Sequence, residues 1–200
     1  MPAKNQDLHG NVPDTSPVAL ILIDLINDLE FEGGRKLLKP AVRAAAAIAK
    51  LKQKARAQGV PVIYANDNFG RWRSDFRETV KHVLEDGVRG QPLAELLQPE
   101  HDDYFVLKTK HSAFYATTLE LLLQYLKAKR VILTGVSGDM CVLFTAADAY
   151  MRDLEILVPE DCIGSVSAVE NRKALQYMKR VFRADTRAST KLDLKKLRKA

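Results

Sequence analysis

The clearest pattern in the sequence is a series of short, continuous apolar runs. The runs are rich in Val, Ile and Leu, and they span residues 18–24, 60–65, 104–108, 131–136 and 154–161. Unbroken runs of this length, rather than alternating ones, are typical of strands that are covered on both faces. We therefore expect a sheet in the interior of the protein.

Segments with helical periodicity lie between these runs. Residues 37–58 are rich in Ala, Lys and Leu and stop before Gly59, residues 117–129 place four leucines on one face, and residues 168–182 form a third such segment. Alternation of strands and helices predicts a mainly parallel sheet with right-handed crossovers. The expected fold is a three-layer α/β/α domain with a doubly wound sheet.

Length and composition favour a single domain. The chain has 200 residues, of which 46% are hydrophobic, enough for a sizeable core. Neither an internal repeat nor a long Pro/Gly/Ser linker interrupts it. We expect one domain over residues 1–200, with a core of about 16–185 and a basic C-terminal tail of about 186–200.

The net charge of +6 is concentrated at the C-terminus. Residues 171–200 hold eleven Lys or Arg and two Asp, whereas residues 1–170 carry a net charge of −3. We interpret the end as a solvated basic tail, so nucleic acid is not an expected partner. The alternative is a non-catalytic binding module that uses this tail for RNA or anionic membranes.

Several features indicate a cytoplasmic protein without a membrane span. The longest apolar runs are far shorter than the roughly 20 residues that cross a bilayer. The N-terminus lacks the apolar centre of a secretory signal, and Cys141 and Cys162 are too few for a disulfide scaffold.

Three polar residues stand at predicted strand ends, where open parallel sheets bind ligands. Asp24 and Lys108 end their strands, and Cys141 follows residues 131–136 across a turn that should open a helix. The first turn of a helix favours a thiolate, and its free N–H groups bind an oxyanion. A small buried cysteine that packs like alanine is the alternative for Cys141.

Asp24 follows an apolar strand, so partial desolvation should raise its pKa towards that of a general base. Asp28 is a second acid that could fill the same role. Lys108 would place an ammonium beside the carboxylate and the thiol. Lys110 points to the same side of an extended strand, so the spacing leaves both lysines open.

Three blocks carry a resemblance to a known family. LILIDLINDL contains Asp24, KTKHSAFYATTLE contains Lys108, and TGVSGDMCVLFTAADA contains Cys141. Together they resemble the signature blocks of the isochorismatase-like cysteine hydrolase superfamily, over residues 18–164. That superfamily includes nicotinamidases, N-carbamoylsarcosine amidases, ureidoacrylate amidohydrolases and isochorismatases. The resemblance implies an isochorismatase-like, Rossmann-like fold and a catalytic triad.

In this triad, the resemblance makes Asp24 the base, Lys108 rather than Lys110 the stabilising cation, and Cys141 the nucleophile. It also implies a non-proline cis peptide at Val136–Ser137, which would direct the N–H groups of Ser137 and Cys141 into an oxyanion hole. Members are often dimers or tetramers, so a homo-oligomer is expected.

The activity implied is acyl transfer to cysteine followed by hydrolysis. We expect cleavage of an amide or carbamoyl C–N bond in a small-molecule substrate. Isochorismatase-type hydrolysis of a vinyl ether is the alternative. Such enzymes do not need a thiol nucleophile, so Cys141 favours C–N hydrolysis.

Neither a metal nor another cofactor is expected. Nicotinamidases of this superfamily bind a metal through an aspartate and closely following histidines, but here Asn68, Gly70 and Arg71 follow Asp67. The chain also lacks a dinucleotide fingerprint. His111 has no second ligand at metal spacing, and we do not expect it to touch substrate. The predicted pocket residues are Asn68, Trp72, Phe114 and Tyr115.

Overall fold

The structure is a computed structural model that describes residues 15–69 and 75–199. Over these residues, six strands form one sheet in the order β3-β2-β1-β4-β5, and β6 also pairs with β4. All of these pairings are parallel. The strands are β1 (Val18–Ile23), β2 (Val62–Asp67), β3 (Tyr104–Lys108), β4 (Arg130–Val136), β5 (Glu155–Leu157) and β6 (Ile163–Gly164). The predicted parallel sheet is confirmed.

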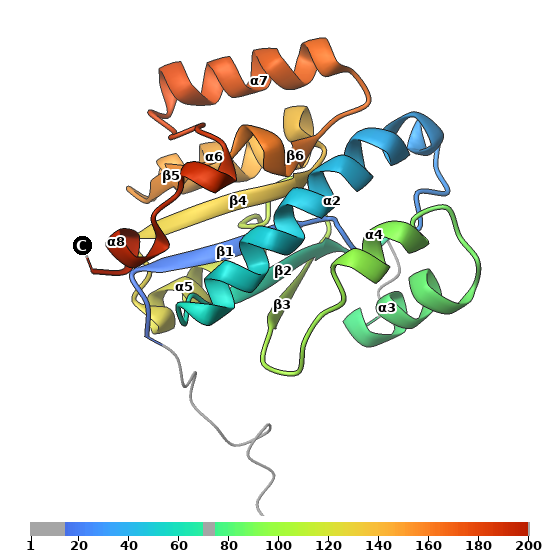
Figure 1. Cartoon of the computed structure of the whole chain (residues 1–200), viewed down its shortest axis with the longest axis horizontal. Helices are drawn as coiled ribbons and strands as arrows, with labels where there is room; N and C mark the ends of the chain where they lie inside the picture. Colours follow the sequence, from blue (N-terminus) through green and yellow to red (C-terminus); the bar gives the residue numbers. More distant parts are fainter. Residues whose placement is uncertain (1–14, 70–74, 200) are drawn as a thin grey trace, which may run out of the picture.

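Helices cover both faces of this sheet (Figure 1). The α-helices are α2 (Gly34–Ala57), α3 (Phe76–Glu85), α4 (Gln91–Leu96), α5 (Leu119–Leu126), α6 (Leu143–Tyr150), α7 (Ala168–Val181) and α8 (Leu194–Lys199). The short turns are η1 (Gly138–Val142), η2 (Glu160–Cys162) and η3 (Ser189–Lys191). The three predicted helical segments correspond to α2, α5 and α7, and the helix expected after Cys141 is α6, whereas α3, α4 and α8 were not predicted.

The position of β1 between two layers of helices explains why its sequence is continuously apolar. Val18, Leu20 and Leu22 point into a core that also contains the buried face of α2. Ala19, Ile21 and Ile23 point into a second core that contains the buried faces of α5 and α6. Successive side chains in a strand face opposite ways, so a strand between two helix layers needs apolar residues at every position. The three-layer prediction is therefore confirmed.

Local signals begin two of the helices. The carboxylate of Asp75 accepts the N–H of Glu78 at 2.9 Å at the start of α3. The hydroxyl of Ser167 accepts the N–H of Glu170 at 3.2 Å at the start of α7. Each bond satisfies a donor that the first helical turn leaves without a partner.

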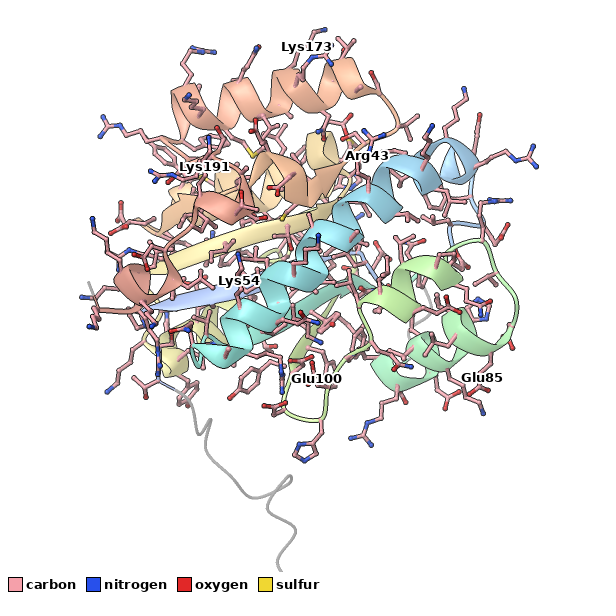
Figure 2. All side chains as sticks on the ribbon, in the orientation of Figure 1. Arg43, Lys54, Glu85, Glu100, Lys173 and Lys191 are labelled. Carbon is pink, nitrogen blue, oxygen red and sulfur yellow. The ribbon has the colours of Figure 1, made fainter. Side chains whose placement is uncertain are left out.

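The C-terminal segment is packed against the domain, so the prediction of a solvated tail is wrong for its backbone. The carboxylate of Asp161 accepts both the N–H and the hydroxyl of Ser189 at 2.7 Å. Leu194 is 5% exposed and belongs to the same core as α2. The lysines of this C-terminal segment are exposed, among them Lys191, which is labelled in Figure 2. The basic charge therefore lies on an ordered surface rather than on a free arm.

We expect Leu194→Ala to lower the free energy of unfolding by about 2–3 kcal/mol, because it removes buried methyl groups and leaves a cavity. Lys195→Ala is the matched control, since Lys195 is an exposed neighbour in the same helix. Urea denaturation of the three proteins measures the difference. Equal stability of both variants would show that α8 does not contribute to the core.

Among the helices of the described residues, none is both long and apolar enough to cross a bilayer. The single domain, the cytoplasmic location and the homo-oligomer stay predictions.

Candidate active site

Asp24 and Lys108 form a buried ion pair at the carboxyl edge of the sheet. Asp24 follows β1, Lys108 ends β3, and Nζ of the lysine lies 2.8 Å from Oδ2 of the aspartate. Their exposed fractions are 5% and 0%. The second carboxylate oxygen of Asp24 accepts the N–H of Asp67, on the strand between them, at 2.7 Å. The carboxylate is therefore held at both oxygens.

Two of the residues at this edge with positive φ angles are Asp24 and Gly135. Asp24 has a φ of 52°, a left-handed conformation that aspartate tolerates better than most residues. Gly135 has a φ of 119° and pairs with Ile23, and a Cβ atom there would overlap the carbonyl oxygen of Ile23. Glycine is thus required for β4 to lie this close to the end of β1. The chain that follows β4 is consequently brought beside Asp24.

Cys141 lies in that following chain. It is part of η1, a π-helical turn that continues directly into α6. Its Sγ atom is 3.6 Å from Nζ of Lys108, and the residue is partly exposed. The structure therefore brings together the three residues that were predicted at separate strand ends.

The environment of Cys141 raises the pKa of its thiol to about 12, which corrects the expected thiolate. Burial is the largest cause, and the carboxylate of Asp24 adds to it, while Lys108 acts in the opposite direction. The helical turn does not offset the loss of hydration. At neutral pH Cys141 is accordingly a thiol, and a base must remove its proton before the sulfur can act as a nucleophile.

The pKa values of Asp24 and Lys108 are both raised, but for different reasons. Burial raises the pKa of Asp24, although the nearby Lys108 opposes this effect, and the predicted upward shift is confirmed. Burial also disfavours the charged form of Lys108, but Asp24 and Cys141 outweigh it, so the pKa of the lysine is raised. Lys108 thus stays cationic, while Asp24 is suited to accept a proton.

The residues of the predicted oxyanion hole lie at the start of η1. The peptide bond between Val136 and Ser137 is cis, at the position that the resemblance implied. The carbonyl oxygen of Ser137 accepts the N–H groups of Met140 and Val142, each at 3.1 Å. The use of the Ser137 and Cys141 N–H groups for an oxyanion stays a prediction.

Geometry separates the candidates that the sequence left open. The side chain of Lys110 is exposed, and only its carbonyl oxygen approaches the site, where it accepts a hydrogen bond from Lys108 at 3.2 Å. Asp28 lies near His82, with 3.5 Å between Oδ2 and Nε2. Lys108 and Asp24 are therefore the members of this cluster.

The predicted pocket residues differ in their exposure. Phe114 is a core side chain, 4% exposed, with the Arg152 guanidinium 4.8 Å from its ring centroid. Tyr115 is exposed and Asn68 is buried just after β2. Trp72 lies outside the described residues. Contact of Asn68, Trp72, Phe114 or Tyr115 with substrate stays a prediction.

Asp67 has a local role at the end of β2. One carboxylate oxygen accepts the N–H of Phe69 at 2.7 Å, and the other lies 3.7 Å from Nζ of Lys108. Across residues 15–69 and 75–199, no three His, Cys, Asp or Glu side chains gather as metal ligands would. The absence of a metal stays a prediction.

His111 was considered from the sequence as a metal ligand and a substrate contact, but its contact with Cys141 was not predicted. Its Nδ1 atom lies 3.7 Å from Sγ of Cys141. The available signal was its place three residues after Lys108, in the same block. Distance along the chain hid the contact, since 30 residues separate it from the cysteine.

We expect iodoacetamide to modify Cys141 in the folded protein and to spare Cys162, which is 0% exposed. Because the pKa of Cys141 is raised to about 12, the thiolate fraction and the rate should rise with pH up to about 10. Intact mass and peptide mapping give the site and rate. Native modification of Cys162, or a rate that levels off near neutral pH, would contradict this environment.

The chain is similar to known proteins in both sequence and structure. A family model described as "Isochorismatase domain" matches residues 18–189. The uncharacterized isochorismatase family protein YaaI of Bacillus subtilis (strain 168) is 41% identical over 167 residues, which are 84% of this chain and 91% of that protein.

Solved structures are also similar. N-carbamoylsarcosine amidase from Thermoplasma acidophilum has a TM-score of 0.67 at 27% identity, covering 88% of this chain and 98% of that one. The nicotinamidase PncA from Bacillus subtilis has a TM-score of 0.67 at 28% identity, covering 86% and 99%.

Proposed function

The chain belongs to the isochorismatase family of hydrolases, and within that family we propose that it is a cysteine hydrolase that cleaves a C–N bond in a small amide or carbamoyl compound. The observation that carries the proposal is the contact of Cys141 Sγ with Nζ of Lys108 at 3.6 Å, in a lysine paired with Asp24. A thiol beside a buried carboxylate and a fixed cation is an arrangement suited to nucleophilic catalysis.

The first half of the reaction forms a thioester. Asp24, whose carboxylate raises the pKa of the Cys141 thiol, takes the proton of that thiol, and the sulfur attacks the carbonyl carbon of the substrate. The electron pair of the C=O bond moves to oxygen, which the N–H groups of Ser137 and Cys141 would hold. The C–N bond then breaks, and the leaving nitrogen takes the proton from Asp24 and departs as ammonia or an amine.

The second half hydrolyses the thioester. Water loses a proton to Asp24 and attacks the same carbonyl carbon, and the C–S bond breaks. The thiolate regains a proton while the acid product leaves. Lys108 remains charged throughout, so it offsets the negative charge that moves among carboxylate, sulfur and oxygen.

The comparisons support C–N hydrolysis through the names of similar proteins, one an amidase and one a nicotinamidase. The residues after Asp67 lack the histidines of the nicotinamidase motif, so we favour amides other than nicotinamide. A binding module built on a free basic tail is disfavoured, because that segment packs against the domain.

The direct test is a substrate panel of ureidoacrylate, N-carbamoyl amino acids and nicotinamide, with release of ammonia as the measurement. We expect ammonia from at least one of the first two classes. Isochorismate is included as the vinyl-ether candidate, and its hydrolysis would give a 2,3-dihydroxy product without ammonia. That product, with no ammonia from any amide, would replace our proposal with the isochorismatase alternative.

A further inference from the structure

We propose that Ser165 and Asn171 are positioning residues, which hold in place the turn that supplies the N–H groups for the oxyanion. The inference rests on the proposed function, because it concerns the same acyl transfer to Cys141. It begins from a hydrogen bond between two segments that are far apart in the chain. The N–H of Asp139, in η1, donates to Oγ of Ser165 at 3.3 Å. The hydroxyl of Ser165 donates in turn to Oδ1 of Asn171 at 2.7 Å.

The N–H of Asp139 differs from its neighbours in the partner that it uses. The first turn of a helix leaves its N–H groups without partners inside the helix, so they need acceptors from elsewhere. In η1 the N–H groups of Met140 and Val142 donate back to the carbonyl oxygen of Ser137. That of Asp139 donates instead to Ser165, which comes after β6. This bond therefore fixes how the turn lies against the rest of the sheet edge.

Asp139 lies midway between Ser137 and Cys141, the two residues whose N–H groups we propose for the oxyanion. The hydroxyl of Ser137 donates to a carboxylate oxygen of Asp139 at 2.5 Å, so Asp139 is bonded through both its backbone and its side chain. A shift of the Asp139 backbone would carry the neighbouring peptide units with it and redirect their N–H groups. Oxyanion donors act only when they are held at hydrogen-bonding distance from the developing charge. Ser165 thus acts on the oxyanion site through Asp139.

The two positioning residues are themselves held by the sheet and by α7. Ser165 is 3% exposed and follows β6, which pairs with the end of β4. Asn171 is near the start of α7, a helix that packs against η1. A Cβ atom on Gly138 would overlap Oδ1 of Asn171, so the amide lies directly over the backbone of the turn. Capping of α7 does not explain this contact, because the hydroxyl of Ser167 caps that helix.

Two reactions of Cys141 separate the oxyanion site from the nucleophile. Acylation by p-nitrophenyl acetate passes through a tetrahedral oxyanion and releases p-nitrophenolate, whereas alkylation by iodoacetamide displaces iodide at a saturated carbon and forms no oxyanion. We expect Ser165→Ala to slow acylation about tenfold, because the N–H donors are held less firmly. The alkylation rate should stay within about twofold of wild type. Release of p-nitrophenolate and intact mass measure the two rates.

Ser167→Ala is the matched control for this experiment. The hydroxyl of Ser167 accepts the N–H of Glu170 in α7, two residues beyond Ser165, so the variant should keep both rates. An equal fall of acylation and alkylation in Ser165→Ala would show that Ser165 only shapes the surroundings of Cys141. Unchanged acylation would show that the turn does not depend on Ser165. Either result would overturn the proposal.

Asn171→Ala tests the second link of this chain at a partly exposed position, and keeps the proposal testable should Ser165→Ala not fold. We expect acylation to fall about threefold, since one hydrogen bond of the chain is lost, and alkylation to stay unchanged. Because both residues act through the same N–H of Asp139, the double variant should acylate no more slowly than Ser165→Ala alone. If the effects of the two substitutions multiplied, the coupling of Asn171 to Ser165 would be overturned.

The same assays distinguish failure of this inference from failure of the proposed function. If acylation by the ester depends on Ser165, but the wild type releases no ammonia from any amide, then the C–N assignment fails and the positioning role stands. If amides are hydrolysed and Ser165→Ala is acylated at the wild-type rate, then the positioning role fails and the C–N assignment stands.

Discussion

Replacing Cys141 by alanine is expected to lower substrate turnover by at least about 10⁴-fold, because it removes the only atom that forms the thioester. Cys141→Ser should be almost as inactive, since the pKa of a hydroxyl lies far above that of a thiol. The remaining rate would come from substrate binding and charge stabilisation alone. Ammonia release per folded protein, over a range of enzyme concentrations, is the measurement.

Cys162→Ala is the matched control for this experiment. Cys162 is buried at the end of η2, just before β6, and its thiol contacts Asp161 at 3.8 Å rather than the triad. The variant should therefore keep its turnover and lose a modest amount of stability. Turnover that persists in Cys141→Ala at more than about one part in 10³ would mean that catalysis is not covalent.

Intact mass spectrometry can detect the thioester on Cys141 directly. Acid quenching during turnover should trap an acyl group on Cys141 in the wild-type protein, and its mass would identify the acyl part of the substrate. Cys141→Ala should carry no adduct. An adduct on Cys162 instead would contradict the assignment of the nucleophile.

The sheet and its catalytic edge were predictable because they follow from local pattern and topology. The continuous run of β1 requires cover on both faces, and parallel strands place their carboxyl ends at one edge. Asp24, Lys108 and Cys141 therefore converge even though the chain separates them widely. The choice of Lys108 over Lys110 needed either a family resemblance or coordinates, because residues two apart in an extended strand point to the same side.

Three other features were not predicted correctly from the sequence: helix α3, the packing of the C-terminal segment and the pKa of Cys141. The N-cap signal of Asp75 with Glu78 was present before α3, but only Phe76, Thr79 and Val83 of this helix are buried, so its apolar pattern is weak. Leu192, Leu194 and Leu197 marked a packed C-terminus, yet the surrounding lysines dominated the interpretation. The pKa of Cys141 was misjudged because burial of the thiol outweighs the favourable helical turn.

Loss of the buried ion pair between Lys108 and Asp24 should lower both turnover and stability. We expect Lys108→Met to lower turnover by at least about 10³-fold and the free energy of unfolding by about 3–5 kcal/mol, because it leaves a buried carboxylate without its cation. Asp24→Asn with Lys108→Met removes both charges. That double variant should recover much of the stability but none of the activity.

The loss of stability should also depend on pH with a definite sign. The pKa of Asp24 is already raised by burial, and removal of Lys108 raises it further. A carboxyl whose folded pKa exceeds its unfolded pKa favours folding at low pH, and that contribution is lost as pH rises through the folded value. The deficit of Lys108→Met relative to wild type should therefore be larger at about pH 8 than at about pH 5.

Urea denaturation at both pH values measures this change, with Lys110→Met as the matched control. Lys110 is a lysine two residues away whose side chain is exposed, so its replacement should alter stability by less than about 0.5 kcal/mol. The double variant should show no extra dependence on pH, because it has no carboxylate at position 24 to titrate. If Lys108→Met were as stable as Lys110→Met at pH 8, the ion pair between Lys108 and Asp24 would not be the element that holds this edge of the sheet together.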